Sequence, residues 1–404
     1  MKGSYYKRGC TCKKKRCNCN TTWAFTIDIG RDPLTGKRRQ KTKSGFSSKE
    51  AAIQASNKLM YELFNDTYIE ESEQTFAMFS QEWLTIYKEV FEVKPGTIRI
   101  RLYELNKLMP YFAELKLKDI TRKTYQDALN DLKALGYSHS TMKGINRTGK
   151  MIFRKALELE LIKKDPTEFT YLKKDKKSIE DFEENEIPKY MEKEELALFL
   201  ETARKQGLTF DYIMFLVLAY TGIRIGELVS LTWQDIDFKA HTIKISKTYY
   251  NPNNNTRNYQ LVAPKTKSSR RTIVIDQLVV DALLKHKAEQ KRIKKQFDSA
   301  YKDNQFVFTN TNQYPGYPIV IKVVQLRMAR LLRLCQLSMD FTPHTLRHTH
   351  TSLLAEAGVS LEQIMERLGH IDDQTTKNIY LHITKEMKKE ASHKFAQLME
   401  SFEL

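Results

Sequence analysis

Apolar and polar residues alternate near the N-terminus, which is the pattern of a β-strand with one buried face. The apolar positions are Trp23, Phe25, Ile27 and Ile29. The sequence Asp-Pro-Leu-Thr-Gly at 32–36 favours a turn, and a second strand-like run follows at 37–43. We therefore predict a β-hairpin within a small three-stranded sheet. Ser47 and Glu50 have the spacing of a capping box, so a helix over 48–64 is expected to cover this sheet.

Residues 75–166 carry apolar positions at helical spacing, and we predict four helices there. One opens near Thr97 and another at Thr121. The helix over 138–159 has a continuous apolar face. That face consists of Met142, Ile145, Ile152, Phe153 and Ala156. The polar faces are rich in Lys and Arg, although any single such residue is more simply explained as solvated surface.

Residues 171–189 are almost wholly charged and lack apolar periodicity, which indicates a linker. Beyond it, helical patterns alternate with strand-like runs at 242–249, 258–263 and 271–275. We predict a multidomain α+β protein: a small N-terminal three-stranded sheet with a helix, an all-α domain, and a mainly α-helical domain with a small antiparallel sheet. The expected boundaries are 1–68, 75–170 and 190–404, with the linker at 171–189.

Charge narrows the class of protein. The chain has 67 Lys and Arg against 49 Asp and Glu, a formal net charge of +18 and a pI near 9.4, which favours a polyanionic partner, with nucleic acid as the first candidate. The longest apolar run, 213–220, is far shorter than the roughly 20 residues of a membrane-spanning helix. Residues 1–20 are basic and do not resemble a signal peptide. We expect a cytoplasmic protein of a bacterial host.

Four of the five cysteines lie close together in the basic N-terminal segment. Cys10, Cys12, Cys17 and Cys19 form two Cys-x-Cys pairs. Four thiolates could bind one structural zinc ion and stabilise a module with a small core. The usual spacing is Cys-x-x-Cys, so solvated thiols are the alternative. Cys335 lies in an apolar helical stretch, where a buried free thiol is expected.

A first candidate site follows an apolar helix that ends at Tyr220. The sequence Thr-Gly-Ile-Arg-Ile-Gly-Glu-Leu at 221–228 places Gly222 where a tight turn is needed and Arg224 where a new helix starts, near unpaired backbone amides. An arginine held there can bind a phosphate through two parallel hydrogen bonds, which a lysine cannot reproduce. By itself this is weak evidence, because an arginine at a helix start is usually structural.

A second candidate cluster is Thr-Pro-His-Thr-Leu-Arg-His. The Thr-Pro pair at 342–343 suits a helix start, so His344 and Arg347 share one face near the positive end of a helix. This is a favourable setting for an anion. His348 lies further round the helix and is assigned a core or supporting role.

A third cluster surrounds a predicted helix end. Residues 360–363 have capping-box spacing, Gly369 suits the position just past the helix, and His370 therefore falls in the following turn. A new helix beginning at about 373–375 then carries Tyr380. Taken separately, His370 or Tyr380 would be interpreted as a residue buried in a hydrophobic core.

In order and content these clusters resemble the catalytic domain of the tyrosine recombinase (phage integrase) family. The resemblance implies that two arginines, here Arg224 and Arg347, clamp the scissile phosphate. It implies that His344 and His370 donate hydrogen bonds or transfer protons, and that Tyr380 is the nucleophile. Tyr380 follows His370 by ten residues, whereas nine is common in the family.

The resemblance covers 191–388 and also implies a lysine on a β-hairpin, acting as general acid to the leaving 5′ oxygen. Lys265, at the end of the strand that enters the turn, is our choice, and Lys267 is the alternative. Glu227 resembles the acidic residue with which the family holds the active site in shape.

The flanking segments resemble other parts of integrases. Residues 75–170 resemble the core-binding domain, and the N-terminal sheet resembles the arm-binding domain, in which a small sheet enters the major groove. In that sheet we expect DNA contacts from Lys37, Arg38, Arg39, Lys41 and Lys43. Residues 384–402 predict a basic amphipathic helix that packs either in cis or on a neighbouring protomer.

The expected activity is site-specific recombination through a 3′-phosphotyrosyl intermediate, without metal or ATP in catalysis, that integrates and excises a phage or other mobile element. Expected partners are double-stranded DNA with core-type and arm-type sites, a homotetramer on DNA, and an excisionase or DNA-bending factor. A type IB topoisomerase is one alternative, but its site preference would be weak. A DNA-binding regulator that no longer cuts conflicts with the complete residue set, and a metal-dependent nuclease lacks a carboxylate cluster near these motifs.

Overall fold

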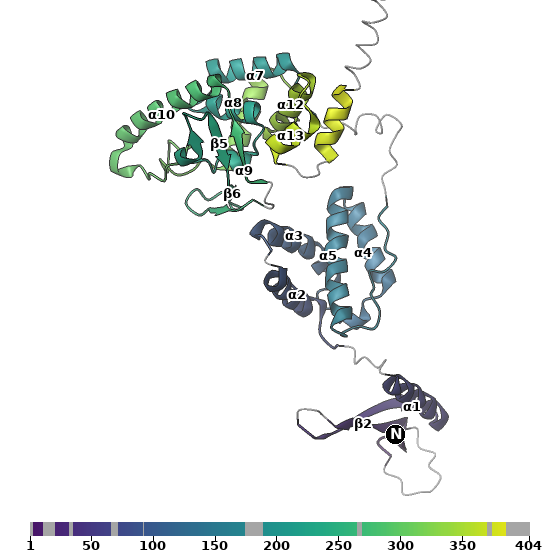
Figure 1. Ribbon diagram of the computed structural model, residues 1–404. Coiled ribbons are helices and arrows are strands. Elements are labelled where there is room, and N and C mark those ends of the chain that lie inside the picture. The colour runs from purple at the N-terminus through teal and green to yellow at the C-terminus, as the bar shows by residue number, and fades with distance from the viewer. Residues whose placement is uncertain are drawn as a thin grey trace, which may run out of the picture. The chain divides into compact units, whose positions relative to one another are not determined.

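The computed structural model describes residues 3–10, 21–31, 35–65, 72–91, 93–173, 189–264, 269–369 and 374–384. Contacts between residues divide the chain into two compact units, Met1–Asp175 and Lys176–Leu404, and each unit is considered by itself (Figure 1). Within the described ranges, no helix combines the length and the apolar character needed to cross a membrane.

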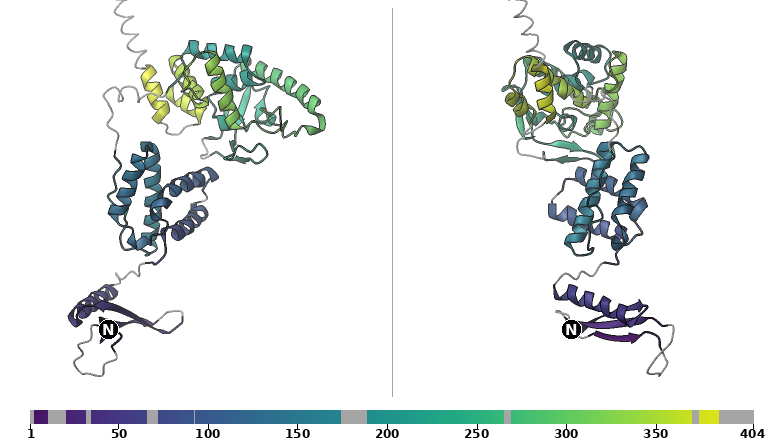
Figure 2. Two further views of the ribbon diagram at one scale, coloured as in Figure 1. Left: turned by 180° about the vertical axis from the view of Figure 1, so that it is seen from behind. Right: turned by 90° about the vertical axis from the view of Figure 1, so that its right-hand side faces the viewer.

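The first unit begins with a three-stranded antiparallel sheet covered on one face by a helix (Figure 2). Its elements are β1 (Gly3–Lys7), β2 (Trp23–Arg31), β3 (Arg38–Phe46) and α1 (Lys49–Phe64). Phe25 and Ile27 of β2 pack against Ala52 and Leu59 of α1, so the predicted sheet and helix are confirmed. The predicted cap is wrong by one residue, because Ser48 is the N-cap and its hydroxyl accepts a hydrogen bond from the amide of Ala51.

The rest of the first unit is helical, as predicted. Its elements are α2 (Phe76–Phe91), α3 (Pro95–Phe112), a 3₁₀ turn (Leu117–Asp119), α4 (Arg122–Ala134) and α5 (His139–Glu158). Four rings, Phe76, Phe112, Tyr125 and Phe153, form a closed circuit with centroid separations from 5.6 to 5.8 Å. Aromatic pairs at this spacing stabilise a core beyond the burial of their area.

The second unit is built around α8, whose sequence is apolar on almost every side. A helix of this kind must be enclosed, and α8 packs against α7, α10 and α12 (Figure 1). The helices are α7 (Lys193–Gln206), α8 (Asp211–Thr221), α9 (Ile225–Leu228), α10 (Gln277–Phe297), α11 (Ile321–Leu334), α12 (Pro343–Glu356), α13 (Leu361–Leu368) and a helix over 374–384.

The strands of the second unit form two small antiparallel sheets. One has the order β4 (Ile236–Asp237), β5 (Thr242–Ile245), β8 (Arg271–Val274), and the other pairs β6 (Thr248–Tyr250) with β7 (Gln260–Val262). The prediction of one strand over 242–249 is therefore wrong, since the run is divided between two sheets. The reason is tertiary: β5 pairs with β8, whereas β6 leaves that sheet to pack on α9.

Candidate catalytic site

Arg224 is held by a tight turn between α8 and α9. Gly222 ends α8 with a φ of 62°, a left-handed conformation, and Arg224 is the N-cap of α9, as predicted. A Cβ on Gly222 would lie 2.8 Å from atoms of both His350 and Leu368, so the turn also requires glycine for space. The same local sequence therefore determines the backbone at Arg224 and allows two other helices to approach it.

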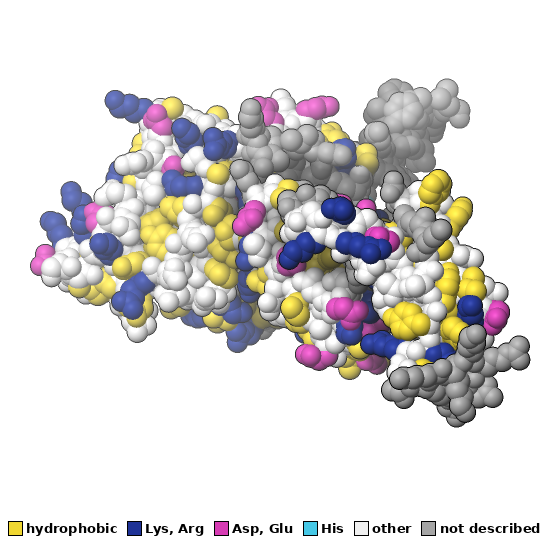
Figure 3. Space-filling model, turned by 90° about the horizontal axis from the view of Figure 1, so that it is seen from below, with side chains coloured by type: hydrophobic (Ala, Val, Ile, Leu, Met, Phe, Trp, Pro, Cys, Tyr) yellow, Lys and Arg dark blue, Asp and Glu magenta, His cyan; other side chains and the backbone are white. Residues whose placement is uncertain are grey.

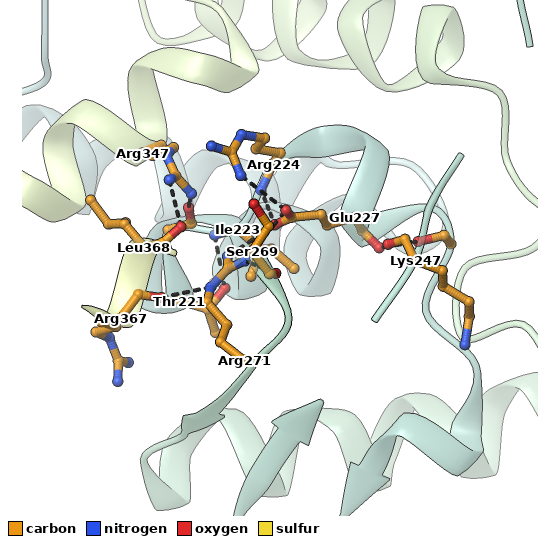
Figure 4. A network of polar contacts seen from close by, with 12 residues as sticks. Thr221, Ile223, Arg224, Glu227, Lys247, Ser269, Arg271, Arg347, Arg367 and Leu368 are labelled. Atoms are coloured by element: carbon orange, nitrogen blue, oxygen red, sulfur yellow. Dashed lines mark hydrogen bonds and ion pairs between the residues drawn. The ribbon is translucent and has the colours of Figure 1, made fainter. Parts of the chain in front are cut away.

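The carboxylate of Glu227 links Arg224 to Arg271 (Figure 4). It accepts hydrogen bonds from the Arg224 backbone amide at 3.0 Å and from the Arg224 guanidinium at 3.1 Å. Arg271 binds the same carboxylate through both terminal nitrogens, at 2.9 and 3.3 Å. Burial would raise the pKa of Glu227, but the hydrogen bond and charge of Arg271, together with Arg224, hold it below its ordinary value. Glu227 is thus a buried anion shared by two arginines.

Arg347 is almost completely enclosed, with 2% of its surface exposed. It lies on α12, which begins with the predicted N-cap Thr342 and with Pro343 in its first turn. Its guanidinium donates to the carbonyl of Gly222 at 2.6 Å and to the carbonyl of Leu368 at 2.7 Å (Figure 4). Both of these acceptors are neutral carbonyls, so neither of them cancels the positive charge of the guanidinium.

That cavity brings together three of the predicted catalytic side chains. It has a volume of about 220 Å³ and is lined by Arg224, His344, Arg347, His348, Thr351, Thr375 and Thr376. The rings of His344 and His348 meet edge to face with centroids 4.6 Å apart. His348, which the sequence assigned a core or supporting role, therefore shares the cavity with His344. Among the described residues that line it there is no carboxylate, so the cavity suits an anion of about the size of a phosphate group.

Tyr380 is carried by the helix over 374–384, whose Thr375 and Thr376 line the cavity. Its side chain is half-buried and packs against a small apolar core of Ala355, Ile364, Leu368, Ile379 and Ile383. Tyr380 is not among the cavity-lining residues, so the structure brings its helix to the site but packs the ring beside it. The predictions for the preceding helix, α13, are confirmed: it begins with a capping box over 360–363 and ends at Gly369, a left-handed C-cap.

Several predicted residues lie outside the described ranges. They are Lys265, Lys267, His370, Cys12, Cys17 and Cys19, together with the tail over 385–404. The zinc site therefore stays a prediction, since only Cys10 of its four ligands is described. Within the described ranges, no group of three or more His, Cys, Asp or Glu residues is placed to hold a metal ion. Cys335 is a partly buried free thiol at the end of α11.

Arg367 and His350, to which no role was assigned from the sequence, support the turn before Arg224 and the start of the loop after β8. Arg367 donates to the carbonyls of Tyr220 and Val274 and to Nε2 of His350, each at 3.0 Å. Burial and the neighbouring Arg367 charge lower the pKa of His350 to about 3, so His350 is a neutral acceptor. Burial and the charge of Arg271 also lower the pKa of Arg367. His350, rather than His348, is thus the core histidine of α12. Both lie on that helix, and no local sequence signal distinguishes them.

In the N-terminal sheet, the five cations predicted to contact DNA do not share one face. Lys41 and Lys43 are paired in register with Ile27 and Phe25, whose side chains face α1. Arg38 forms an ion pair with Asp28 at 2.7 Å. Of the five cations, Lys41 is half-buried and the other four are exposed.

The fold and the cavity define a DNA strand-transfer enzyme of the tyrosine recombinase class, and comparison with known families agrees. The phage integrase family matches residues 189–387, the arm DNA-binding domain matches 13–62, and the N-terminal SAM-like domain of phage integrases matches 75–133. The chain belongs to the phage integrase family. It is a site-specific recombinase that cleaves and rejoins DNA strands, a reaction for which this family needs no cofactor.

Several of its relatives are integrases of phages and other mobile elements. The integrase of Staphylococcus phage L54a is 28% identical over 353 residues, covering 85% of this chain and 98% of that protein. The ICEBs1 integrase of Bacillus subtilis strain 168 is 25% identical and covers 94% and 98%. The Tn1549 transposon integrase, solved in complex with transposon right end DNA, has a similar fold, with a TM-score of 0.62, 22% identity and coverage of 79% of this chain and 100% of that one.

Proposed function

We propose that this recombinase cuts DNA by attack of the Tyr380 hydroxyl on a scissile phosphate bound between Arg224 and Arg347. The observation that supports this assignment is the cavity in which both guanidinium groups meet the imidazoles of His344 and His348. Attack on a phosphodiester gathers negative charge on the non-bridging oxygens, and two fixed guanidinium groups stabilise that charge directly. Glu227 keeps Arg224 oriented toward the same point.

The bond changes balance without a cofactor. The phenolic oxygen of Tyr380 forms a bond to phosphorus, the bond from phosphorus to the 5′ oxygen breaks, and the chain is left attached to a 3′ phosphate. The phenol proton passes to a neighbouring base, for which His344 and His370 are the proposed residues. Lys265, with Lys267 as the alternative, supplies the proton to the departing 5′ oxygen. Attack of another strand's 5′ hydroxyl on the phosphotyrosine reverses these steps and joins new ends.

The substrate is double-stranded DNA at attachment sites of a phage or other mobile element. Lys and Arg side chains are spread over the part of the surface drawn in Figure 3, with acidic side chains among them. On α5 four cations, Lys143, Arg147, Lys150 and Arg154, recur at the spacing of one helix face. None of the four forms an ion pair with a described residue, which favours a role in binding phosphates.

Pairwise strand exchange requires several active sites at once, so we propose that the chain acts as a homotetramer assembled on DNA in the bacterial cytoplasm. A lambda integrase structure with 17% identity and a TM-score of 0.50 was solved as a tetramer bound to a Holliday junction. An excisionase or DNA-bending factor is proposed as an additional partner. The N-terminal sheet is proposed to bind arm-type sites through Lys37, Arg38, Arg39, Lys41 and Lys43, of which all but Lys41 are exposed.

The test is covalent trapping on a nicked suicide duplex that carries a cognate attachment site, with wild type compared to Tyr380→Phe on denaturing gels. We expect a protein–DNA adduct with wild type alone, while both proteins bind the duplex equally. An adduct with Tyr380→Phe would refute the nucleophile assignment. Tight binding without any wild-type adduct would instead favour a regulator. Equal adduct on an unrelated duplex would favour a topoisomerase.

A further inference from the structure

Arg271 is a buried arginine that does not line the cavity but contacts the residues that support it. It is the first residue of β8, paired in register with Ile245, and only 6% of its side chain is exposed. Its Nη2 and Nη1 donate to the two oxygens of Glu227, and its Nε donates to the carbonyl of Arg367 at 2.7 Å. Nη1 also lies 3.3 Å from the carbonyl of Ser269. Every nitrogen of the guanidinium is therefore used in holding other groups (Figure 4).

The two main contacts of Arg271 lead to the two arginines that line the cavity. Through Glu227 it reaches Arg224, since both guanidinium groups bind the same carboxylate. Through the carbonyl of Arg367 it holds the last turn of α13, and the next carbonyl along, that of Leu368, is bound by Arg347. Arg271 is thus hydrogen-bonded both to Glu227, which orients Arg224, and to the end of α13, which orients Arg347.

We propose that Arg271 is a positioning residue for strand cleavage, which fixes Glu227 and the end of α13 so that Arg224 and Arg347 address one phosphate together. The inference rests on the proposed roles of those two arginines. A planar guanidinium can bind a carboxylate through two nitrogens while its third nitrogen donates at a different angle, whereas an ammonium group cannot hold that geometry. A lysine at position 271 would keep the charge and lose the alignment.

The simpler explanation is a buried ion pair that only stabilises the unit, and the chain contains a matched control. Arg327 forms an ion pair with Asp211 at 3.0 Å, with exposures of 17% and 0%, in the same unit. Its guanidinium also donates to the carbonyl of Thr209, in the turn before α8, and neither Asp211 nor Thr209 lines the cavity. Arg327→Lys therefore reproduces the loss of a buried pair without disturbing the cavity.

The experiment measures single-turnover cleavage of the suicide duplex at saturating protein, alongside the Kd for the same duplex and the thermal midpoint of the full chain. We expect Arg271→Lys to cleave on the order of 100-fold more slowly, the range seen when transition-state alignment of a charged group is lost, with a Kd within about threefold of wild type. Arg327→Lys should lower the midpoint and cleave at nearly the wild-type rate. The proposal is wrong if Arg271→Lys cleaves normally, or if both variants lose cleavage in proportion to stability.

Three further comparisons distinguish a failure of the proposed role of Arg271 from a failure of the proposed function. If Arg271 acts through Glu227, then Arg271→Lys combined with Glu227→Gln should cleave no more slowly than the slower single variant, whereas independent roles would multiply the losses. Added guanidinium ion should partly restore cleavage by Arg271→Ala, and sodium at the same ionic strength should not; restoration by both would count against the proposal. If Arg224→Lys cleaves like wild type, the proposed function of the arginines fails and not only the role of Arg271.

Discussion

The guanidinium of Arg347 donates a 2.6 Å hydrogen bond to the carbonyl of Gly222, a residue 125 positions earlier in the chain. The bond joins the helix that carries one cavity arginine to the turn that positions the other. Because Gly222 adopts a left-handed conformation there, the orientation of its carbonyl depends on the identity of the residue. The two arginines are therefore coupled through the backbone of one glycine.

Replacing Gly222 should damage both stability and cleavage. In Gly222→Ala the left-handed conformation costs about 1 kcal/mol, and the new Cβ would lie 2.8 Å from atoms of His350 and Leu368. We expect unfolding free energy to fall by roughly 2–4 kcal/mol in urea titrations. Gly358→Ala is the matched control, since Gly358 has a φ of 81° but no atom within 4 Å of the added Cβ, and it should cost only about 1 kcal/mol. Equal losses from the two substitutions would contradict the steric argument.

The stability of the second unit should decrease in mild acid. Burial lowers the pKa of His286 to about 4 and that of His350 to about 3, from an ordinary 6.5. As the pH falls below 6.5 the unfolded chain binds protons that the folded chain does not, so folding weakens by on the order of 2 kcal/mol per histidine at pH 5. Glu227 has a lowered pKa and so titrates below this range.

Urea titrations at pH 7.5 and pH 5 measure this effect. His286 lies among Phe210, Trp233 and Phe308, so His286→Phe should fit the site and remove its share of the pH dependence. An unchanged difference between the two pH values in this variant would show that His286 is not responsible.

Salt dependence should reveal whether the α5 cations contact DNA. Each lost phosphate contact reduces the slope of log K against log salt concentration by about 0.9, so Arg147→Ala and Lys150→Ala should each lower it by nearly that amount on any duplex. Lys155 lies on the same helix but pairs with Glu158, and Lys155→Ala should leave the slope unchanged. If all three variants bind like wild type at every salt concentration, the α5 cations are solvated surface.

The local sequence predicted the positions of the elements that carry the chemistry. Thr342 and Pro343 at the start of α12, the capping box of α13 and the glycine turn before Arg224 all form where expected, because caps and turns depend on neighbours within a few residues. The order of the motifs was also sufficient to indicate the family. These features are properties of short segments and could be recognised without knowing how the segments meet.

Only the tertiary structure determined which side chains meet. Arg271 begins the strand predicted over 271–275, but only the pairing of β8 with β5 buries it against Glu227. The strand predicted over 242–249 was divided because β6 packs on α9, where a Cβ at Gly226 would lie 2.6 Å from the Thr248 hydroxyl. Strand partners and contacts between distant helices depend on surfaces far apart in the chain, so no local pattern encodes them. The sequence by itself determined the chemical groups and the turns that present them. The fold decided that Arg224 and Arg347 line one cavity and that Arg271 contacts the residues that support them.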